Sequence, residues 1–224
     1  MLEKNQAGGE RLFTLPFVSI TLVSLVSGIY SVMLMTTVLM YGSHMGYSAA
    51  AAGLLASSYA FASLFMRPFT GYLSDRFSKK RLCLIGLSGY ILAALTLVFA
   101  RSYFLYLGVR ILSGAAMALA STASGAIASQ VIPPSRFTEG IGFYGIGMTL
   151  GAAVAPAIGL WLIENLGYRG MFLASAGGAA AALLLMLAIP GGAPSGAGAG
   201  SFRLRGLLRG MYEPSAVFAS ASTL

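Results

Sequence analysis

Charged side chains are sparse in this chain, and one short stretch gathers several of them where they could act together. Charged residues make up only 9% of the sequence, yet Asp75, Arg76, Lys79 and Lys80 follow closely after Gly71. A carboxylate near a helix N-terminus and paired with cations is stabilised, and that set is broken when packed elements slide apart. The stretch is therefore a candidate conformational latch. The plain alternative is a cluster of positive charge that holds a loop on one side of a membrane.

A second candidate is an arginine inside an apolar run. Arg110 lies two helical turns, about 10 Å, from the start of its run at Tyr103. A charge at such a depth in a membrane is costly and usually faces a cavity or a partner. We expect Arg110 to bind an anionic substrate group or to tune a coupling carboxylate, the alternative being that it snorkels to the interface. Tyr30 and Tyr144 could line the same cavity, or serve as packing residues.

Residues for enzymatic chemistry are scarce. The chain has one histidine, His44, and one cysteine, Cys83. A clustered metal site or a CxxC redox pair needs more of these ligands than the chain holds. An intramembrane serine protease needs serine and histidine together inside helices, whereas His44 falls in a predicted loop. We therefore expect no enzyme, no metal and no cofactor.

The elements that would carry these residues are membrane spans. Hydrophobic residues make up 57% of the chain and the mean hydropathy is +0.82, whereas soluble domains are far more charged. The net charge of +8 could suggest nucleic acid, but the charges flank apolar runs, so the expected partner is a lipid bilayer. Runs long enough for a transmembrane helix cover residues 13–40, 48–69, 82–100, 103–132, 141–163 and 171–189.

The basic residues predict the orientation of these spans. Of the fourteen lysines and arginines, Arg110 falls within a predicted span, and Arg101 and Arg169 fall on one side of the membrane. The other eleven fall on the opposite side. Positive charge marks the cytoplasmic side. We therefore expect a cytoplasmic N-terminus in a multi-pass protein of the bacterial cell (inner) membrane.

An internal repeat and a small-residue face suggest how the helices pack. Pro68 and Pro156, 88 positions apart, each begin a Pro-x-x-Gly pattern, which favours two inverted three-helix repeats, a construction typical of secondary transporters. Gly147, Gly151 and Gly159 share one helix face around Pro156, where small residues allow close approach and proline can kink the helix. Static packing and a hinge or seal are both open for this face.

The charged stretch resembles the signature loop of the major facilitator superfamily, Gly-x-x-x-Asp-Arg-x-Gly-Arg-Arg. Gly71, Asp75 and Arg76 match, lysines replace the arginine pair at Lys79 and Lys80, and Ser78 stands where glycine is usual. Arg110 to Gly114 is similar to the family's Arg-x-x-Gln-Gly, with Ser113 for glutamine. Gly151 to Gly159 resembles the Gly-x-x-x-Gly-Pro-x-x-Gly motif of its drug–proton antiporters, with Ala155 before Pro156.

The resemblance implies an all-α membrane protein, half of a twelve-helix transporter. It implies that the latch holds two halves together, that Arg110 serves proton transfer, and that a small solute moves by alternating access, with efflux and proton antiport as the expected mode. We expect a six-helix bundle over residues 1–189, a Gly/Ala-rich basic linker over 190–214 and the start of a truncated seventh helix over 215–224. The expected partners are a small-molecule substrate and either a C-terminal six-helix half or a second copy. The rival reading is a truncated membrane scaffold that transports nothing.

Overall fold

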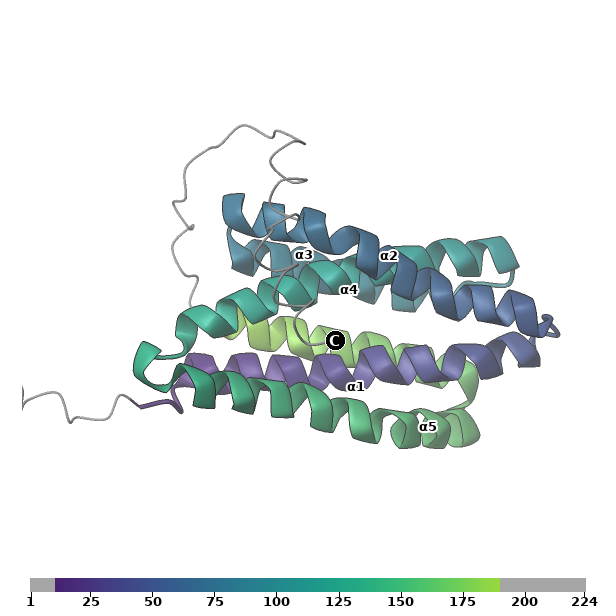
Figure 1. The fold of residues 1–224 in the computed structure, drawn as a ribbon. Coiled ribbons are helices and arrows are strands. Elements are labelled where there is room, and N and C mark those ends of the chain that lie inside the picture. Colours follow the sequence, from purple (N-terminus) through teal and green to yellow (C-terminus); the bar gives the residue numbers. More distant parts are fainter. Residues whose placement is uncertain (1–10, 190–224) are drawn as a thin grey trace, which may run out of the picture.

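The computed structural model describes residues 11–189, and its long elements there are all helices (Figure 1). The chain order is α1 (Leu15–His44), α2 (Ala49–Arg76), α3 (Lys79–Phe99), α4 (Tyr103–Val131), the short 3-10 helix η1 (Pro134–Arg136) and α5 (Phe137–Ala188). Within this range five helices are long and apolar enough to cross a membrane. The expected all-α fold is thus confirmed, while the inverted repeats stay a prediction. The linker over 190–214 and the helix start over 215–224 lie outside the described residues.

Side-chain caps set the beginnings of the first two helices. The Thr14 hydroxyl accepts a hydrogen bond from the Phe17 amide, and Pro16 occupies the first turn of α1. The Ser48 hydroxyl accepts from the Ala51 amide at the start of α2. Such caps satisfy backbone donors that a helix start leaves free, and proline fits there because it has no N–H to satisfy.

The last helix reverses direction at Gly167. This residue has φ 68° and ψ 179° inside α5, a conformation that glycine adopts at little cost. Before the break, α5 runs in the same direction as α1, since Gly151 lies beside Leu25 and Gly159 beside Met33. After the break it runs in the opposite direction, since Met171 contacts Thr37 and Gly178 lies beside Tyr30. Helix α5 therefore consists of two antiparallel arms, residues 137–166 and 168–188, both lying along α1.

Several predicted boundaries were wrong. Helix α2 continues to Arg76 rather than ending near residue 69, α1 continues to His44 rather than ending at 40, and α3 and α5 begin at Lys79 and Phe137 rather than at 82 and 141. The expectation followed the apolar side chains, but helical hydrogen bonds continue past the apolar region. Only Phe77 and Ser78 separate α2 from α3, and neither has positive φ, so serine is compatible with the turn where the family usually has glycine.

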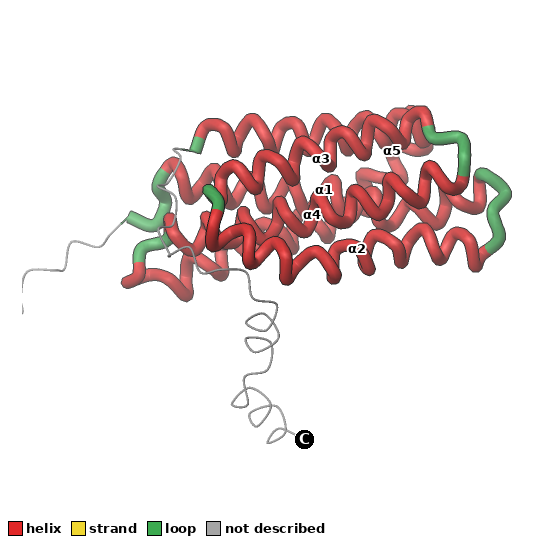
Figure 2. Tube along the Cα trace, turned by 90° about the horizontal axis from the view of Figure 1, so that it is seen from above, coloured by secondary structure: helices red, strands yellow, loops and turns green. Residues whose placement is uncertain are grey.

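The helices form a bundle (Figure 2), and α2 is the most exposed of them. Only 11% of its most apolar stretch is buried, against 56% for α1 and for α4. Its exposed side chains are large and apolar, and include Leu54, Phe61, Leu64 and Phe65. A surface of this kind marks contact with lipid or with another protein.

Candidate functional site

The most unusual side chain of the bundle is a fully buried arginine. Arg110 in α4 is 0% exposed. Its Nε donates a hydrogen bond to the Leu55 carbonyl of α2 at 3.2 Å, and its guanidinium carbon lies 4.7 Å from the centroid of the Tyr59 ring. Its two terminal nitrogens are buried without a hydrogen-bond partner. Arg110 therefore points into the α2–α4 contact and does not snorkel to an interface.

A glycine one turn away brings the two helices together at this point. A Cβ atom at Gly114 would lie 2.3 Å from the Tyr59 carbonyl oxygen, so only glycine permits this approach of α4 to α2. Arg110 and Gly114 share one face of α4, because residues four apart lie above one another. Leu55 and Tyr59 are likewise one turn apart on α2. The Arg-x-x-Ser-Gly spacing thus places the guanidinium over the ring.

The positive charge of Arg110 is not compensated by a described acidic side chain, and hydrogen-bond donors around it are left without partners. The Tyr106 hydroxyl, one turn earlier on α4, is also buried without a partner. Among the described residues, the ion pair found joins Arg136 and Glu139 on the surface, 2.6 Å apart. Arg110 thus has no carboxylate partner in the part of the chain that the structure describes. Unpaired N–H donors of a buried cation can hold an anionic group through charge-assisted hydrogen bonds.

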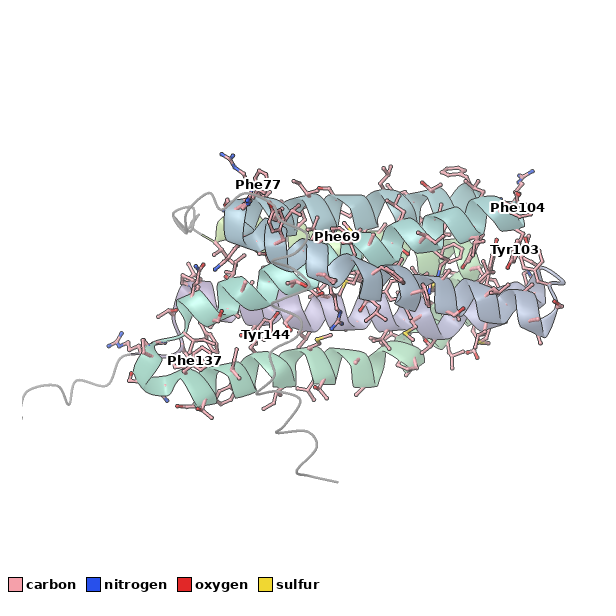
Figure 3. All side chains as sticks on the ribbon, turned by 45° about the horizontal axis from the view of Figure 1, so that its top comes forward. Phe69, Phe77, Tyr103, Phe104, Phe137 and Tyr144 are labelled. Carbon is pink, nitrogen blue, oxygen red and sulfur yellow. The ribbon has the colours of Figure 1, made fainter. Side chains whose placement is uncertain are left out.

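Tyr144 belongs to a polar seam between three helices. Its hydroxyl shares a 2.9 Å hydrogen bond with the Ser124 hydroxyl of α4, and its carbonyl accepts one from Ser24 of α1 at 3.3 Å. Figure 3 shows Tyr144 between α5 and α1. A cavity of about 20 Å³ lies in this seam, where Ser27 and Ser121 join the same lining.

The sequence prediction named the tyrosine but missed the serines of this seam. The sequence does contain a pattern that indicates these serines. They occur as pairs three residues apart inside apolar runs, at 24 and 27 and again at 121 and 124. Such polar pairs on one helix face indicate a hydrogen-bonded contact within a membrane bundle.

Tyr30, the other tyrosine expected to line a cavity, lies in the core. It is 1% exposed, and its ring centroid is 4.6 Å from that of Tyr90 in α3. Its hydroxyl donates to Ser27, and its carbonyl accepts from the Tyr90 hydroxyl. This position matches the packing alternative, with Tyr30 joining α1 to α3.

The latch residues occupy helix ends rather than a loop. Gly71 and Arg76 lie in α2, and Lys79 and Lys80 form the first turn of α3. The Arg76 guanidinium carbon lies 4.5 Å from the centroid of the Tyr72 ring. Asp75 is the penultimate residue of α2, and its side chain lies outside the described part of the structure. The structure thus places the latch stretch at one end of the bundle and leaves its partner across a second half as a prediction.

Lys80 has a structural role within the bundle itself. Its ammonium group donates to the Leu187 carbonyl at 3.0 Å and also to the Ile189 carbonyl. These carbonyls lie at the C-terminal end of α5, where the helix leaves acceptors unpaired and its dipole favours a cation. Lys80 therefore ties the end of α5 to the start of α3.

The small-residue face of α5 packs against α1. Gly147, Gly151 and Gly159 are all buried, and a Cβ atom at Gly151 would lie 2.2 Å from the Leu25 carbonyl oxygen. Pro156 lies in this arm, and the backbone angles of α5 stay helical through it, with Gly167 as the non-helical residue. In this conformation the face serves close packing inside the chain.

These helices and motifs agree with a family match. Residues 19–218 match the model of the Major Facilitator Superfamily. The chain belongs to the major facilitator superfamily. The resemblance noted from the charged stretch is thus confirmed, and the chain is a multi-pass membrane protein of a transporter family.

Individual relatives match over shorter stretches. The chain is 32% identical over 124 residues to the class B tetracycline resistance protein of Escherichia coli, covering 55% of this chain and 30% of that protein. It is 30% identical over 106 residues to a multidrug resistance protein B homolog of Mycobacterium tuberculosis, covering 47% and 20%.

A solved structure shows the same fold. The chain superposes on a POT family transporter in complex with 5-aminolevulinic acid with a TM-score of 0.73 at 17% identity, covering 92% of this chain and 46% of that one. At this identity the likeness concerns the fold alone. The chain spans about half the length of this transporter and matches a smaller share of the curated relatives.

Proposed function

We propose that this superfamily chain contributes the N-terminal half of a secondary transporter that exports a small solute by alternating access. In this proposal the two arms of α5 cross the membrane separately, so that the bundle makes six crossings. A C-terminal six-helix half or a second copy would cover the exposed apolar face of α2. Export is supported by relatives that are named for multidrug and tetracycline resistance.

The observation that carries the proposal is the uncompensated Arg110. A fully buried guanidinium with two unpartnered nitrogens is expensive to keep in a membrane bundle. Such a cost is expected where an anionic group arrives during function, either on the solute or on a proton-carrying carboxylate beyond the described residues. Proton-coupled antiport is the form of coupling that we propose.

The orientation rests on the charges. The ends of α2 and α4 and the starts of α1, α3 and α5 lie at one end of the bundle (Figure 1), and Arg11, Arg76, Lys80 and Arg136 lie in or next to these segments. Arg101 and Arg169 lie at the other end. Because basic residues mark the cytoplasmic face, we propose that the N-terminus is cytoplasmic.

The test is solute flux in inverted membrane vesicles with tetracycline and ethidium as probes. Arg110→Gln and Arg110→Lys should abolish proton-driven flux, since Lys keeps the charge but not the forked donors. The control is Arg81→Gln, which removes an exposed charge at the other end of the bundle. Flux that both Arg110 variants retain would overturn the assigned role of Arg110. Vesicles in which the unaltered chain moves neither probe would favour a non-transporting scaffold.

A further inference from the structure

A cavity opens at the end of the bundle opposite to the basic end. It has a volume of about 520 Å³ and lies where α1 and α3 end and α5 breaks. Its lining includes Tyr41, Tyr168 and Phe172 together with His44, Arg101 and Arg169. The volume is within the range of about 300–1,000 Å³ that is typical of small-ligand sites.

The aromatic part of this cavity is a packed cluster. The ring centroid of Tyr41 lies 5.1 Å from that of Tyr168 and 5.3 Å from that of Phe172, and Tyr168 lies 5.0 Å from His44. The Tyr41 hydroxyl donates to the Ala100 carbonyl at 3.3 Å, which fixes the end of α1 to the end of α3. The cavity therefore has a rigid aromatic wall that joins three segments distant in sequence.

The charges of the cavity are positive and uncompensated. Arg101 lies in the turn between α3 and α4, whereas Arg169 lies in the second arm of α5, and they are the arginines that line this cavity. Neither forms an ion pair with a residue that the structure describes. Glu164, the acid nearest in sequence to the lining, is exposed and does not line the cavity. Two cations from distant parts of the sequence thus line one cavity.

The position of the cavity is that of the lipid headgroups. Arg101 lies in the short turn between α3 and α4, at the limit of both spans. Tyr103 and Phe104 mark the same end in Figure 3, opposite to Phe77 and Phe137. Aromatic rings gather at the membrane–water interface. Below this level, Leu92, Leu95 and Phe99 recur at helical spacing on an exposed face of α3, a surface suited to acyl chains.

We infer that this cavity is a binding site for the phosphate-bearing headgroup of an anionic phospholipid in the membrane leaflet at this end. Two guanidinium groups from separate segments of the chain can hold a phosphate through forked hydrogen bonds. The aromatic wall excludes water on the other side, and the acyl chains continue along the apolar face of α3. Free inorganic phosphate shares the recognised group and is the competing source. The site lies apart from Arg110 and does not require transport.

The test is lipid binding to the purified full chain, measured by native mass spectrometry with phosphatidylglycerol and phosphatidylcholine. The chain should bind phosphatidylglycerol more tightly, because only that lipid brings a net negative charge. Arg101→Gln and Arg169→Gln should each weaken binding by about fivefold, and the double variant by about twenty-fivefold. Arg81→Gln, an exposed charge at the other end, should leave this binding unchanged. Both substitutions lie on the exposed surface, and a thermal melt confirms that the double variant is folded.

Two results would overturn the inference. Phosphatidylglycerol binding by the folded double variant that equals that of the unaltered chain removes the arginines from any lipid site. A parallel titration with inorganic phosphate separates the sources. Arginine-dependent phosphate binding without arginine-dependent lipid binding assigns the cavity to a soluble anion instead. Neither readout depends on solute flux. The lipid site can therefore be refuted while the proposed transport role stands, and the transport role can be refuted while the lipid site stands.

Discussion

Replacing Gly151 by alanine tests the close packing of α5 on α1. The new Cβ atom would lie 2.2 Å from the Leu25 carbonyl oxygen and 3.1 Å from the Ile29 amide. Both contacts are backbone atoms, so neither can rotate away, and the helices must separate by about 1 Å to reach ordinary van der Waals distance. Overpacking of this kind costs about 1–3 kcal/mol. For a chain of this size we expect a melting temperature about 2–12 °C lower.

The matched control is Gly145→Ala in the same arm of α5. A Cβ atom at Gly145 would meet no atom within 4 Å, so alanine should bring only its better helix propensity, worth up to about 1 kcal/mol. Its melting temperature should equal or exceed that of the unaltered chain.

The chain carries its own reporter for this measurement. Cys83, the one cysteine of the sequence, is fully buried, so a thiol-reactive maleimide dye labels it only as the bundle opens. Melting curves of the detergent-purified variants then give the difference directly. Equal melting temperatures for Gly151→Ala and Gly145→Ala would refute the reasoning, because they would mean that α1 and α5 do not approach each other at Gly151.

Three further variants test other parts of the structure, all by the same Cys83 melt. Lys80→Met removes the ammonium group from the α5 carbonyls and should cost about 1 kcal/mol, whereas Lys79→Met, beside it, should cost less; equal losses would contradict the capping role. Arg110→Met removes a buried, partly unpartnered guanidinium, so it should retain or raise the melting temperature while abolishing vesicle flux, and a collapse of folding would show that the arginine is structural. Gly167→Ala places a side chain at φ 68° and ψ 179°, a region that only glycine adopts readily, and should cost about 1–3 kcal/mol. Gly177→Ala, in open space, should be neutral or stabilising, and no difference between the two would refute the reversal at Gly167.

Much of the fold could be predicted because each membrane span is visible in the sequence as one long apolar run. Apolar runs long enough to cross a bilayer located all five long helices and placed a separate run on each side of Gly167, although ends of α1, α2, α3 and α5 were misjudged. The boundaries failed because the prediction followed apolar side chains, whereas the helices continue past the apolar runs. The turn at Ser78 was compatible with a residue other than glycine because its backbone needs no positive φ.

Individual residues of the candidate site around Arg110 and Tyr144 could be predicted, but the contacts between them could not. Composition marked Arg110 as unusual, since a charge inside an apolar run is rare and costly. Its partners on α2 were not visible, because Leu55 and Tyr59 are more than fifty positions away and have ordinary types. Tyr144 was named, but Ser24 and Ser124, which complete its hydrogen bonds, were not, because small polar residues inside apolar runs carry little signal individually.

The sequence by itself determined that this chain is a helical membrane protein of the major facilitator superfamily, because run length, charge placement and the signature spacing are local properties. The tertiary structure decided which side chains meet. It placed Arg110 over Tyr59 through the close approach at Gly114, joined Lys80 to the end of α5, and brought Arg101 and Arg169 to one cavity. Contacts between helices depend on the rotation and crossing of each helix in the packed bundle, and spacing along a single helix does not specify these.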